Sequence, residues 1–201
     1  MCGGGMVKQW LFTWVLALLV LPFSSAASLV SNTQYDKYIY KAWEEYVPET
    51  QCWLWLKAQY YQESLLDPEA TSHVGAMGLA QIMPGTWIDV SKKLKFNPRA
   101  SPYDPKLSIE AGAFYLRYQW SQWRAKRTFE DRISLAFAGY NAGLGNILKA
   151  QRLSGGRADW KSISYFLPEV TGENSKETIQ YVERIFRWKK QLDEHRSCAV
   201  Y

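Results

Sequence analysis

The sequence predicts a single, mainly α-helical domain. Apolar residues recur at helical spacing along most of the chain, whereas alternating strand patterns are weak everywhere. The length of 201 residues suits one domain with a short appendage. An apolar fraction of 47% against 21% charged residues supplies a real core. No repeat, low-complexity tract or interdomain linker follows the N-terminal segment.

The N-terminal segment has the pattern of a secretory signal peptide. One lysine, Lys8, precedes the apolar run 10–21, and a string of small residues follows. The run is shorter than the roughly 20 residues of a membrane-spanning helix, so a retained anchor is the less favoured alternative. We therefore expect residues 1–26 to be a signal peptide and residues 27–201 to fold after export to the periplasm or cell envelope.

The cysteines fit an exported protein. Cys52 and Cys198 would remain after removal of the signal, which makes them a candidate disulfide in an oxidising compartment. The alternative is a buried free thiol at Cys52 and a loose thiol in the tail. Two histidines and two distant cysteines offer no cluster of zinc ligands, so we expect neither a metal nor another cofactor.

The charge and the aromatic content narrow the class of partner. A net charge of +5 favours anionic partners, but the chain lacks the long basic run of a nucleic-acid-binding protein, and we expect no nucleic-acid partner. Ten tryptophans and thirteen tyrosines would mostly build the core. Aromatic rings also stack on sugars, so these residues are compatible with glycan binding.

The first predicted helix covers about residues 51–64. Its stripe begins with apolar side chains and ends at a carboxylate, as the spacing i, i+4, i+7, i+11 of Cys52, Leu56, Gln59 and Glu63 shows. Pro68 disfavours a helical residue before it, so the helix should end shortly before Pro68. Glu63 would then lie in the last turn on an apolar face, which is unusual for a solvated carboxylate.

Two further helices are predicted in the middle of the chain. Asp104 and Pro105 match an N-cap followed by a first-turn proline, and the helix should continue to about residue 124. Its predicted buried face consists of Leu107, Ala111, Phe114 and Tyr118. The next helix covers about residues 130–139, and the sequence Asn-Ala-Gly at 141–143 should break it.

The last predicted helix spans about residues 175–194. Its inner face should carry Ile179, Val182 and Phe186, with Glu177, Tyr181 and Trp188 on an adjacent stripe. The preceding region 153–174 is rich in glycine, serine and charge, and is predicted to be a long surface loop.

Four short motifs stand in order along about two-thirds of the chain. They are Glu63-Ser64, Gly75-Ala76-Met77-Gly78-Leu79-Ala80-Gln81 with Met83-Pro84, Gly139-Tyr140-Asn141-Ala142-Gly143, and Tyr181 within Glu177-Thr178-Ile179-Gln180-Tyr181. In these motifs the sequence resembles the catalytic domain of the soluble lytic murein transglycosylases, relatives of goose-type lysozyme. It departs from them at Ala80, where methionine is usual, and at Gly139, where alanine is usual. Both residues are small and apolar, so we expect them to alter substrate fit rather than chemistry.

The resemblance implies a single lysozyme-like domain of the SLT type with a deep glycan cleft. It implies a lyase that cleaves the β-1,4 bond between N-acetylmuramic acid and N-acetylglucosamine and forms 1,6-anhydro-N-acetylmuramic acid. Glu63 would act first as acid and then as base, and an apolar setting would raise its pKa from the reference value of about 4.3. The implied substrate-binding residues are Ser72, Gln81, Tyr140, Asn141 and Tyr181.

Two alternatives stay open at this stage. A goose-type lysozyme would hydrolyse the same bond with water, with Asp67 or Glu69 as partner of Glu63. A non-catalytic wall-binding module would keep the groove without the reaction. The resemblance implies glycan strands of peptidoglycan as the partner of a monomer, in the service of a secretion, conjugation or phage assembly.

Overall fold

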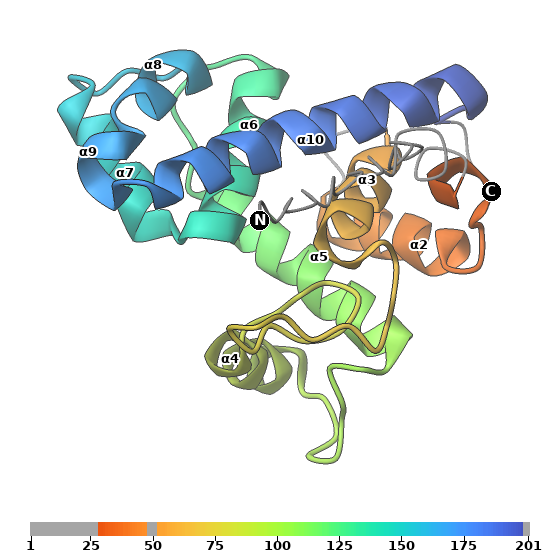
Figure 1. The fold of residues 1–201 in the computed structure, drawn as a ribbon. Helices are drawn as coiled ribbons and strands as arrows, with labels where there is room; N and C mark the ends of the chain where they lie inside the picture. The colour runs from red at the N-terminus through yellow and green to blue at the C-terminus, as the bar shows by residue number, and fades with distance from the viewer. Residues whose placement is uncertain (1–27, 48–51, 199–201) are drawn as a thin grey trace, which may run out of the picture.

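A computed structural model describes residues 28–47 and 52–198. Within these ranges the secondary structure is helical, and β contacts are confined to the isolated bridges Thr71–Met77 and Met77–Ile82. The helices follow in the order α2 (Asp36–Tyr46), α3 (Leu54–Ser64), α4 (Pro84–Leu94), α5 (Pro105–Ser121), α6 (Phe129–Ala142), α7 (Leu144–Leu153), α8 (Trp160–Tyr165), α9 (Leu167–Thr171) and α10 (Asn174–His195) (Figure 1).

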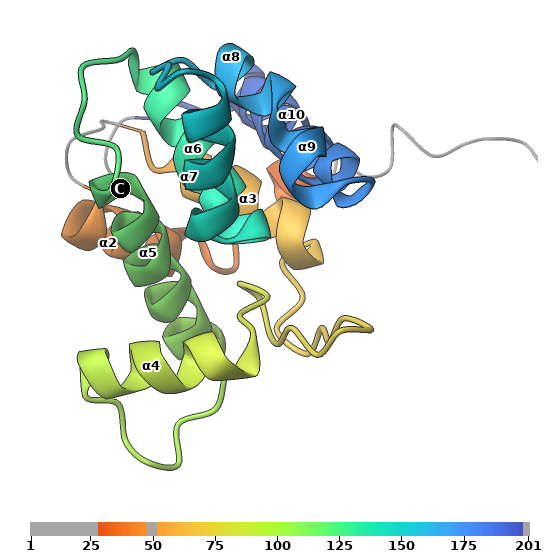
Figure 2. The ribbon, with the colours of Figure 1, turned by 90° about the vertical axis from the view of Figure 1, so that its left-hand side faces the viewer.

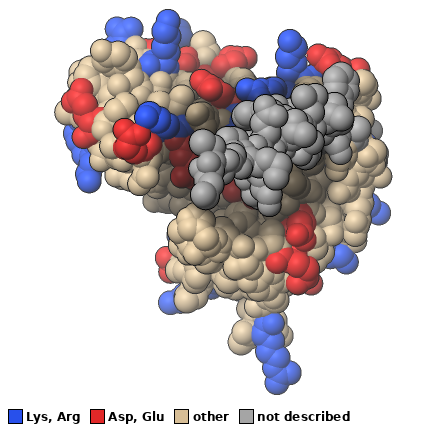
Figure 3. All heavy atoms as spheres, viewed as in Figure 1, with Lys and Arg blue, Asp and Glu red and all other residues tan. Residues whose placement is uncertain are grey.

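Two long helices organise the arrangement. Helix α10 packs most extensively against α3 and also contacts α6 and α9 (Figure 1). Helix α5 contacts α2, α4 and α6. Figure 2 shows α4 and its flanking loops as a lower lobe, whereas α7, α8 and α9 gather in an upper lobe with part of α10. In the space-filling view, basic and acidic side chains are interspersed over the upper part of the molecule (Figure 3).

The tryptophans mostly build the core, as predicted, whereas some tyrosines, such as Tyr165, are exposed. None of the tryptophans in the described ranges is exposed; Trp43, Trp53, Trp120 and Trp123 are almost fully buried. Trp55 packs edge-on against Phe186 with ring centroids 4.7 Å apart, which joins α3 to α10. Aromatic burial therefore holds together the two helices that carry the site described below.

The buried face predicted for α5, the helix capped by Asp104, is wrong, because a different set of its residues is buried. Only Ala111 of that face is fully buried, and Tyr118 is 43% exposed. Helix α5 instead buries Ile109, Ala113, Leu116 and Trp120. Because α5 is packed by three other helices, its buried surface is wider than one stripe, and the small residues Ala111 to Ala113 allow close approach. The predicted cap is confirmed, since Asp104 accepts hydrogen bonds from Lys106 N and Leu107 N.

The prediction of a long surface loop over 153–174 is also wrong. This region contains α8 and α9, and Ile163 and Leu167 are fully buried. The missed signals are Asp159, which caps α8 by accepting from Ser162 N at 2.8 Å, and Pro168 in the first turn of α9. The sequence reading also passed over α2, α4 and α7.

The inner face of α10 differs from the prediction by part of a turn. Val182 is buried as expected, but Thr178 and Ile185 are buried in place of the half-buried Ile179 and Phe186. Tyr181, expected on an adjacent stripe, is 4% exposed. The inner stripe is wider than predicted because α10 lies against α3 and α6 together.

The C-terminal end of α10 is tied to the start of α3 by a disulfide. Cys52 and Cys198 are bonded, with their Cα atoms 4.8 Å apart, which confirms the predicted pair. The linkage closes a separation of 146 residues. It joins the two helices at the opposite end of α3 from Glu63, because Cys52 precedes the helix and Glu63 stands in its last turn.

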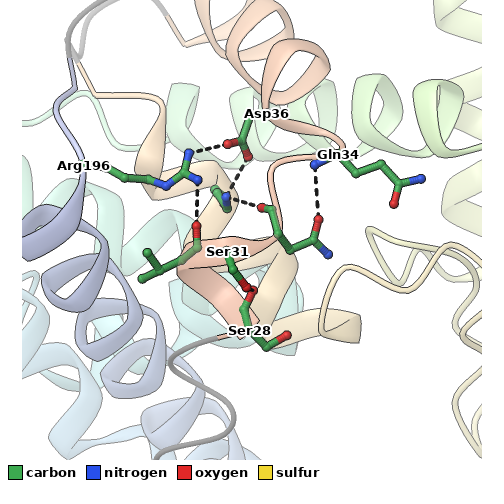
Figure 4. Close-up of polar contacts among 8 residues, drawn as sticks. Ser28, Ser31, Gln34, Asp36 and Arg196 are labelled. Atoms are coloured by element: carbon green, nitrogen blue, oxygen red, sulfur yellow. Dashed lines mark hydrogen bonds and ion pairs between the residues drawn. The ribbon is translucent and has the colours of Figure 1, made fainter.

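A buried charge cluster ties the same region to α2. Asp36, 2% exposed at its side chain, accepts from Arg196 and pairs with the fully buried Lys57 at 2.7 Å (Figure 4). Lys57 also donates to Asn32 O at 2.6 Å, and Arg196 donates to Val30 O at 2.7 Å. The cluster thereby joins α2 and the residues just before it, Val30 and Asn32, to α3 and to the residue that follows α10.

The predicted signal segment 1–26 lies outside the described residues. Within the described ranges, no helix has both the length and the apolarity needed to cross a bilayer.

Candidate functional site

The site is built around the end of α3. Glu63 stands in the last turn, and the helix stops at Leu65 and Leu66, which both adopt left-handed backbone angles with φ of 57° and 66°. Pro68 disfavours a helical conformation of the preceding residue, Asp67, but the helix already ends before Asp67. The Ser64 hydroxyl donates to Leu79 O at 2.8 Å and fastens the helix end to the loop that follows.

A hydrogen-bonded chain of three side chains holds the Glu63 carboxyl. Tyr181 of α10 donates its hydroxyl hydrogen to Glu63 Oε1, and Gln59 of α3 donates from Nε2 to the Tyr181 hydroxyl oxygen at 3.2 Å. Gln59 is fully buried. Tyr181, which the family resemblance implies as a substrate-binding residue, directs its hydroxyl towards Glu63.

The surroundings raise the pKa of Glu63 from 4.5 to about 8. Burial is the largest cause, because it disfavours the charged carboxylate. The hydrogen bond from Tyr181 acts in the opposite direction, and the negative charge of Glu177 raises the pKa further. The upward shift that the apolar stripe predicted is therefore present, and the carboxyl carries its proton near neutral pH.

The loop between α3 and α4 is held by polar contacts to several helices. Tyr140 of α6 donates to Ala80 O at 2.7 Å, and Ala80 N donates to Ser108 Oγ of α5 at 3.2 Å. Gly78 has φ of 70°, and a Cβ built on it would lie 2.0 Å from Pro102 O. Only glycine fits at this position, because any side chain would collide with the backbone of the neighbouring loop.

A pocket of about 300 Å³ opens over Glu63. Its lining includes every residue that the sequence singled out for the site: Glu63, Ser72, Gln81, Tyr140, Asn141 and Tyr181. His73 is exposed and also lies on the pocket wall. The structure thus brings together side chains from α3, the following loop, α6 and α10.

Tyr140 and Asn141 are placed differently from the prediction. They were expected in a loop after their helix, but α6 continues to Ala142 and Gly143, at φ of 82°, ends it. Asn141 Oδ1 accepts from Thr178 Oγ1 of α10 at 2.8 Å, which fixes the orientation of the amide. The helix continues because Tyr140 is anchored by its hydroxyl and Asn141 by α10, so the Asn-Ala pair does not form a turn.

Some of the predicted sugar contacts are partly used by the protein. Gln81 donates from Nε2 to Ala70 O and Gly78 O, which leaves its Oε1 for other contacts. The Ser72 oxygen accepts from Ala76 N at 2.9 Å, and its hydroxyl hydrogen is left to donate. Both residues therefore brace the loop and still present one polar atom to the pocket.

A second cavity of about 240 Å³ shares Gln81, Met83, Tyr140 and Asn141 with the pocket and extends it past Tyr115. Among the described residues that line this second cavity, none is charged. The two pockets adjoin at these four shared residues. The groove that they outline has charged side chains around Glu63 and uncharged ones beyond Tyr140.

Besides His73, three polar residues line the pocket that the sequence analysis did not predict as site residues. These are Gln62, Glu177 and Arg184. The sequence contained a signal for Arg184, because Glu177, Tyr181 and Arg184 follow the spacing i, i+4, i+7 and therefore share one stripe of α10. Asp67 and Glu69, considered as partners of Glu63, do not line the pocket; Asp67 instead accepts from Glu69 N at 2.9 Å in a local turn.

The two departures from the family motifs lie outside the pocket. Ala80 is fully buried, and a Cβ on Gly112 would approach Ala80 Cβ to 2.7 Å. A Cβ on Gly139 would lie 2.4 Å from Gln119 Oε1. Both small residues therefore allow close packing between α5 and its neighbours. Neither lines the pocket, so the expected effect on substrate fit is not explained by a direct contact with substrate.

The family follows from a match of the transglycosylase SLT domain to residues 48–163. The chain belongs to the SLT family. The matched region contains Glu63, Ser72, Gln81, Tyr140 and Asn141, whereas Tyr181 comes from α10 beyond it. The site of this SLT domain is thus completed by a helix outside the matched region.

Curated relatives carry lytic transglycosylase names. The chain is 33% identical over 155 residues to membrane-bound lytic murein transglycosylase F of Haemophilus influenzae strain PittGG, which aligns 70% of this chain with 31% of that protein. It is 34% identical over 155 residues to the protein of the same name from Histophilus somni strain 129Pt, with the same coverage of 70% and 31%. The chain thus spans about a third of the length of these relatives.

Solved structures confirm the predicted fold, a mainly α, lysozyme-like domain of the SLT type. The 70 kDa soluble lytic transglycosylase SLT70 from Escherichia coli matches with a TM-score of 0.60 and 28% identity over 77% of this chain and 24% of that one. A complex of the 70 kDa enzyme with bulgecin A matches with a TM-score of 0.62 and 28% identity, over 80% and 24%. An inactive mutant of lytic transglycosylase Slt from Pseudomonas aeruginosa, at 24% identity and a TM-score of 0.63 over 85% and 26%, adds support for the fold alone.

Proposed function

We propose that the protein is a peptidoglycan lytic transglycosylase with Glu63 as its catalytic acid and base. The observation that carries the proposal is a carboxyl with a pKa of about 8 at the base of a pocket. Membership of the SLT family and the names of the curated relatives support the same conclusion. The groove over Glu63 would be the glycan cleft, with its uncharged part holding sugar rings.

The first step is cleavage of the bond between N-acetylmuramic acid and N-acetylglucosamine. Glu63 donates its proton to the glycosidic oxygen, which leaves as the hydroxyl of N-acetylglucosamine, and the C1–O bond breaks. The carbonyl oxygen of the substrate's own N-acetyl group stabilises the positive charge at C1, a substrate-assisted route that needs no second protein carboxylate. A pKa of about 8 keeps the required proton on Glu63 near neutral pH.

The second step closes a ring within the same sugar. The Glu63 carboxylate takes the proton of the C6 hydroxyl, and the C6 oxygen attacks C1 to form 1,6-anhydro-N-acetylmuramic acid. Glu63 is then protonated again and ready for the next cycle. No water is consumed, because the hydroxyl of the sugar replaces it as nucleophile.

The remaining predicted residues would position the sugar. Asn141 has its Oδ1 occupied by Thr178, so its Nδ2 group is oriented to donate to a substrate carbonyl. Ser72 can donate its hydroxyl hydrogen, and Gln81 can accept through Oε1. Tyr140 would act as a wall, since its hydroxyl is committed to Ala80 O. Tyr181 would orient the Glu63 carboxyl.

The main product should carry 1,6-anhydro-N-acetylmuramic acid ends. An intramolecular hydroxyl in the right geometry has an effective molarity of about 10⁵ M or more, against about 55 M for water. Digestion of purified peptidoglycan followed by mass spectrometry distinguishes the products, because the anhydro fragment is lighter than the hydrolysed one by one water. Predominance of the hydrolysed mass would replace this proposal with a goose-type lysozyme.

Glu177 is the carboxylate to test in that case. It lines the pocket with Glu63, unlike Asp67 and Glu69. If water is the nucleophile and Glu177 activates it, Glu177→Gln should remove the activity. In the transglycosylase the same variant keeps the anhydro product, because Glu177 then affects only the pKa of Glu63.

The pH profile gives a separate expected result. Because the first step needs protonated Glu63, kcat/KM should fall as the pH rises through about 8. Tyr181→Phe removes a hydrogen bond that lowers the pKa of Glu63, so the fall should move to higher pH; Glu177→Gln removes a charge that raises it, so the fall should move to lower pH. The measurement is the initial rate of fragment release across about pH 3 to 10, a range that includes both candidate pKa values, with Glu69→Gln as an exposed control outside the pocket. A fall centred near the ordinary value of 4.5 would contradict the assignment.

The cellular setting follows from the same proposal. Action on peptidoglycan strands requires a place in the cell envelope, reached by export with residues 1–26 as the signal and 27–201 as the folded domain. The chain would act as a monomer that opens the wall for a secretion, conjugation or phage assembly. A pure wall-binding module is the remaining alternative, and a turbidity assay on wall suspensions separates it from an enzyme, because a binder leaves the turbidity unchanged.

A further inference from the structure

Arg184 is a charged residue of the pocket to which the proposed reaction gives no role. It lies on α10 at the spacing i, i+4, i+7 with Glu177 and Tyr181, so the three side chains share one stripe of the helix. Among the described residues that line the pocket over Glu63, Arg184 is the sole lysine or arginine. A permanent positive charge therefore stands beside the proposed point of cleavage.

The guanidinium of Arg184 is not committed to any group of the protein in the described ranges. Its Nε atom is buried and has no hydrogen-bond partner there. Two acceptors of the same pocket are engaged elsewhere, since Gln62 Oε1 accepts from Trp188 Nε1 at 3.1 Å and Glu63 Oε1 accepts from Tyr181. Glu177 is seven residues away, about 10 Å along the helix axis. The side chain as a whole is only half-buried and lines the pocket. The two terminal nitrogens of the guanidinium, and not the shielded Nε, are therefore the donors that can meet a group arriving with the substrate.

The chemistry of that group follows from the shape of the guanidinium. Its planar fork matches a carboxylate with two parallel hydrogen bonds. The glycan backbone of peptidoglycan supplies no carboxylate when its lactyl groups are amide-linked to peptides, and its sugars suit the uncharged second cavity. The carboxylates of the polymer then belong to the peptide stems.

We infer that Arg184 binds a carboxylate of the peptide stem and gives the enzyme a preference for glycans that carry charged stems. The inference rests on the proposed function, because the position of the substrate in the pocket is set by the proposed contact between Glu63 and the glycosidic oxygen. Arg184 stands one helical turn from Tyr181, about 5–6 Å between their Cβ atoms, and Tyr181 touches Glu63. Two or three extended stem residues span roughly 7–10 Å, so a stem on the cleaved muramic acid can reach the guanidinium.

The test compares two substrates that differ only in stem charge. One is native peptidoglycan with intact stems, and the other is the same material after its stem carboxyls have been converted to amides. The proteins are the full-length wild type, Arg184→Met, and Arg187→Met, an exposed arginine of the same helix outside the pocket. The readout is kcat/KM for release of fragments, with the thermal unfolding midpoint as a check on folding.

We expect amidation to lower kcat/KM of the wild type by about tenfold or more, as loss of a charge-assisted pair would. Arg184→Met should show the same loss on native peptidoglycan and no further loss on the amidated material, because the two changes remove one interaction. Arg187→Met should behave as the wild type on both. Arg184→Lys, which keeps the charge but not the fork, should fall between wild type and Arg184→Met.

Three other results would contradict the inference. A wild type that is equally active on both substrates overturns the inference without any variant. A loss by the same factor on both substrates for Arg184→Met also overturns it, since the residue would then act on folding or on the sugar. A wild type that releases fragments from neither substrate contradicts the proposed function, and with it this inference.

Discussion

Glu63→Gln is expected to abolish turnover of peptidoglycan while leaving the fold intact. The amide has nearly the shape of the acid and can still accept the hydrogen bond from Tyr181, but it cannot give a proton to the leaving oxygen. General acid–base assistance is typically worth about 10²–10⁴-fold, and here one group supplies it in both steps. The measurement is the rate of fragment release, alongside the circular dichroism spectrum and unfolding midpoint of the same preparation.

Glu177→Gln is the matched control, because it makes the same chemical change in the same pocket. It should retain activity near neutral pH. Purified Glu63→Gln that keeps more than a tenth of the wild-type rate would remove Glu63 from its proposed role.

Asp36→Ala is expected to lower the free energy of unfolding by about 3–5 kcal/mol. The substitution removes the carboxylate that compensates Lys57, whose side chain is fully buried, and that Arg196 contacts from the end of α10 (Figure 4). A buried charge without its partner is strongly destabilising, because no water replaces the lost interaction. Denaturant unfolding of the oxidised protein measures the effect.

The control is Glu173→Ala, which breaks an exposed pair with Lys176 at 2.6 Å. That change should stay within about 0.5 kcal/mol, because exposed ion pairs contribute little. The double variant Asp36→Leu with Lys57→Met should recover part of the loss by removing both buried charges. A loss for Asp36→Ala no larger than that for Glu173→Ala would show that the buried cluster contributes little to stability.

Local sequence patterns correctly predicted those features that depend on residues close together in the chain. The caps at Asp104 and Pro105, the end of the last helix and the stripe leading to Glu63 are all present in the structure. The stripe also gave the upward direction of the Glu63 pKa. The expectation of export, with two cysteines left after the signal segment, was sufficient to predict the Cys52–Cys198 pair. It did not predict which residues surround the disulfide.

Faces and loop contents were harder to predict, because they depend on which neighbour packs against an element. The buried face of α5 is shared among three helices, so a single stripe mispredicts it at Tyr118. Residues 153–174 look polar on average, yet Ile163 and Leu167 are sufficient to anchor two short helices once α7 and α10 lie beside them. Composition averages over a window, whereas burial is decided residue by residue.

The motifs identified Glu63, but not how its protonation is controlled. The Tyr181 hydroxyl reaches Glu63 across 118 residues of sequence, and the charge of Glu177 arrives on the same helix. Asn141 faces the pocket from a helix that Thr178 of α10 supports, not from the turn its neighbours suggest. Residue types and spacing therefore determine which groups are available, whereas the packing of α10 on α3 and α6 determines their distances and pKa values, because electrostatic and hydrogen-bond energies depend on separations that no local pattern encodes.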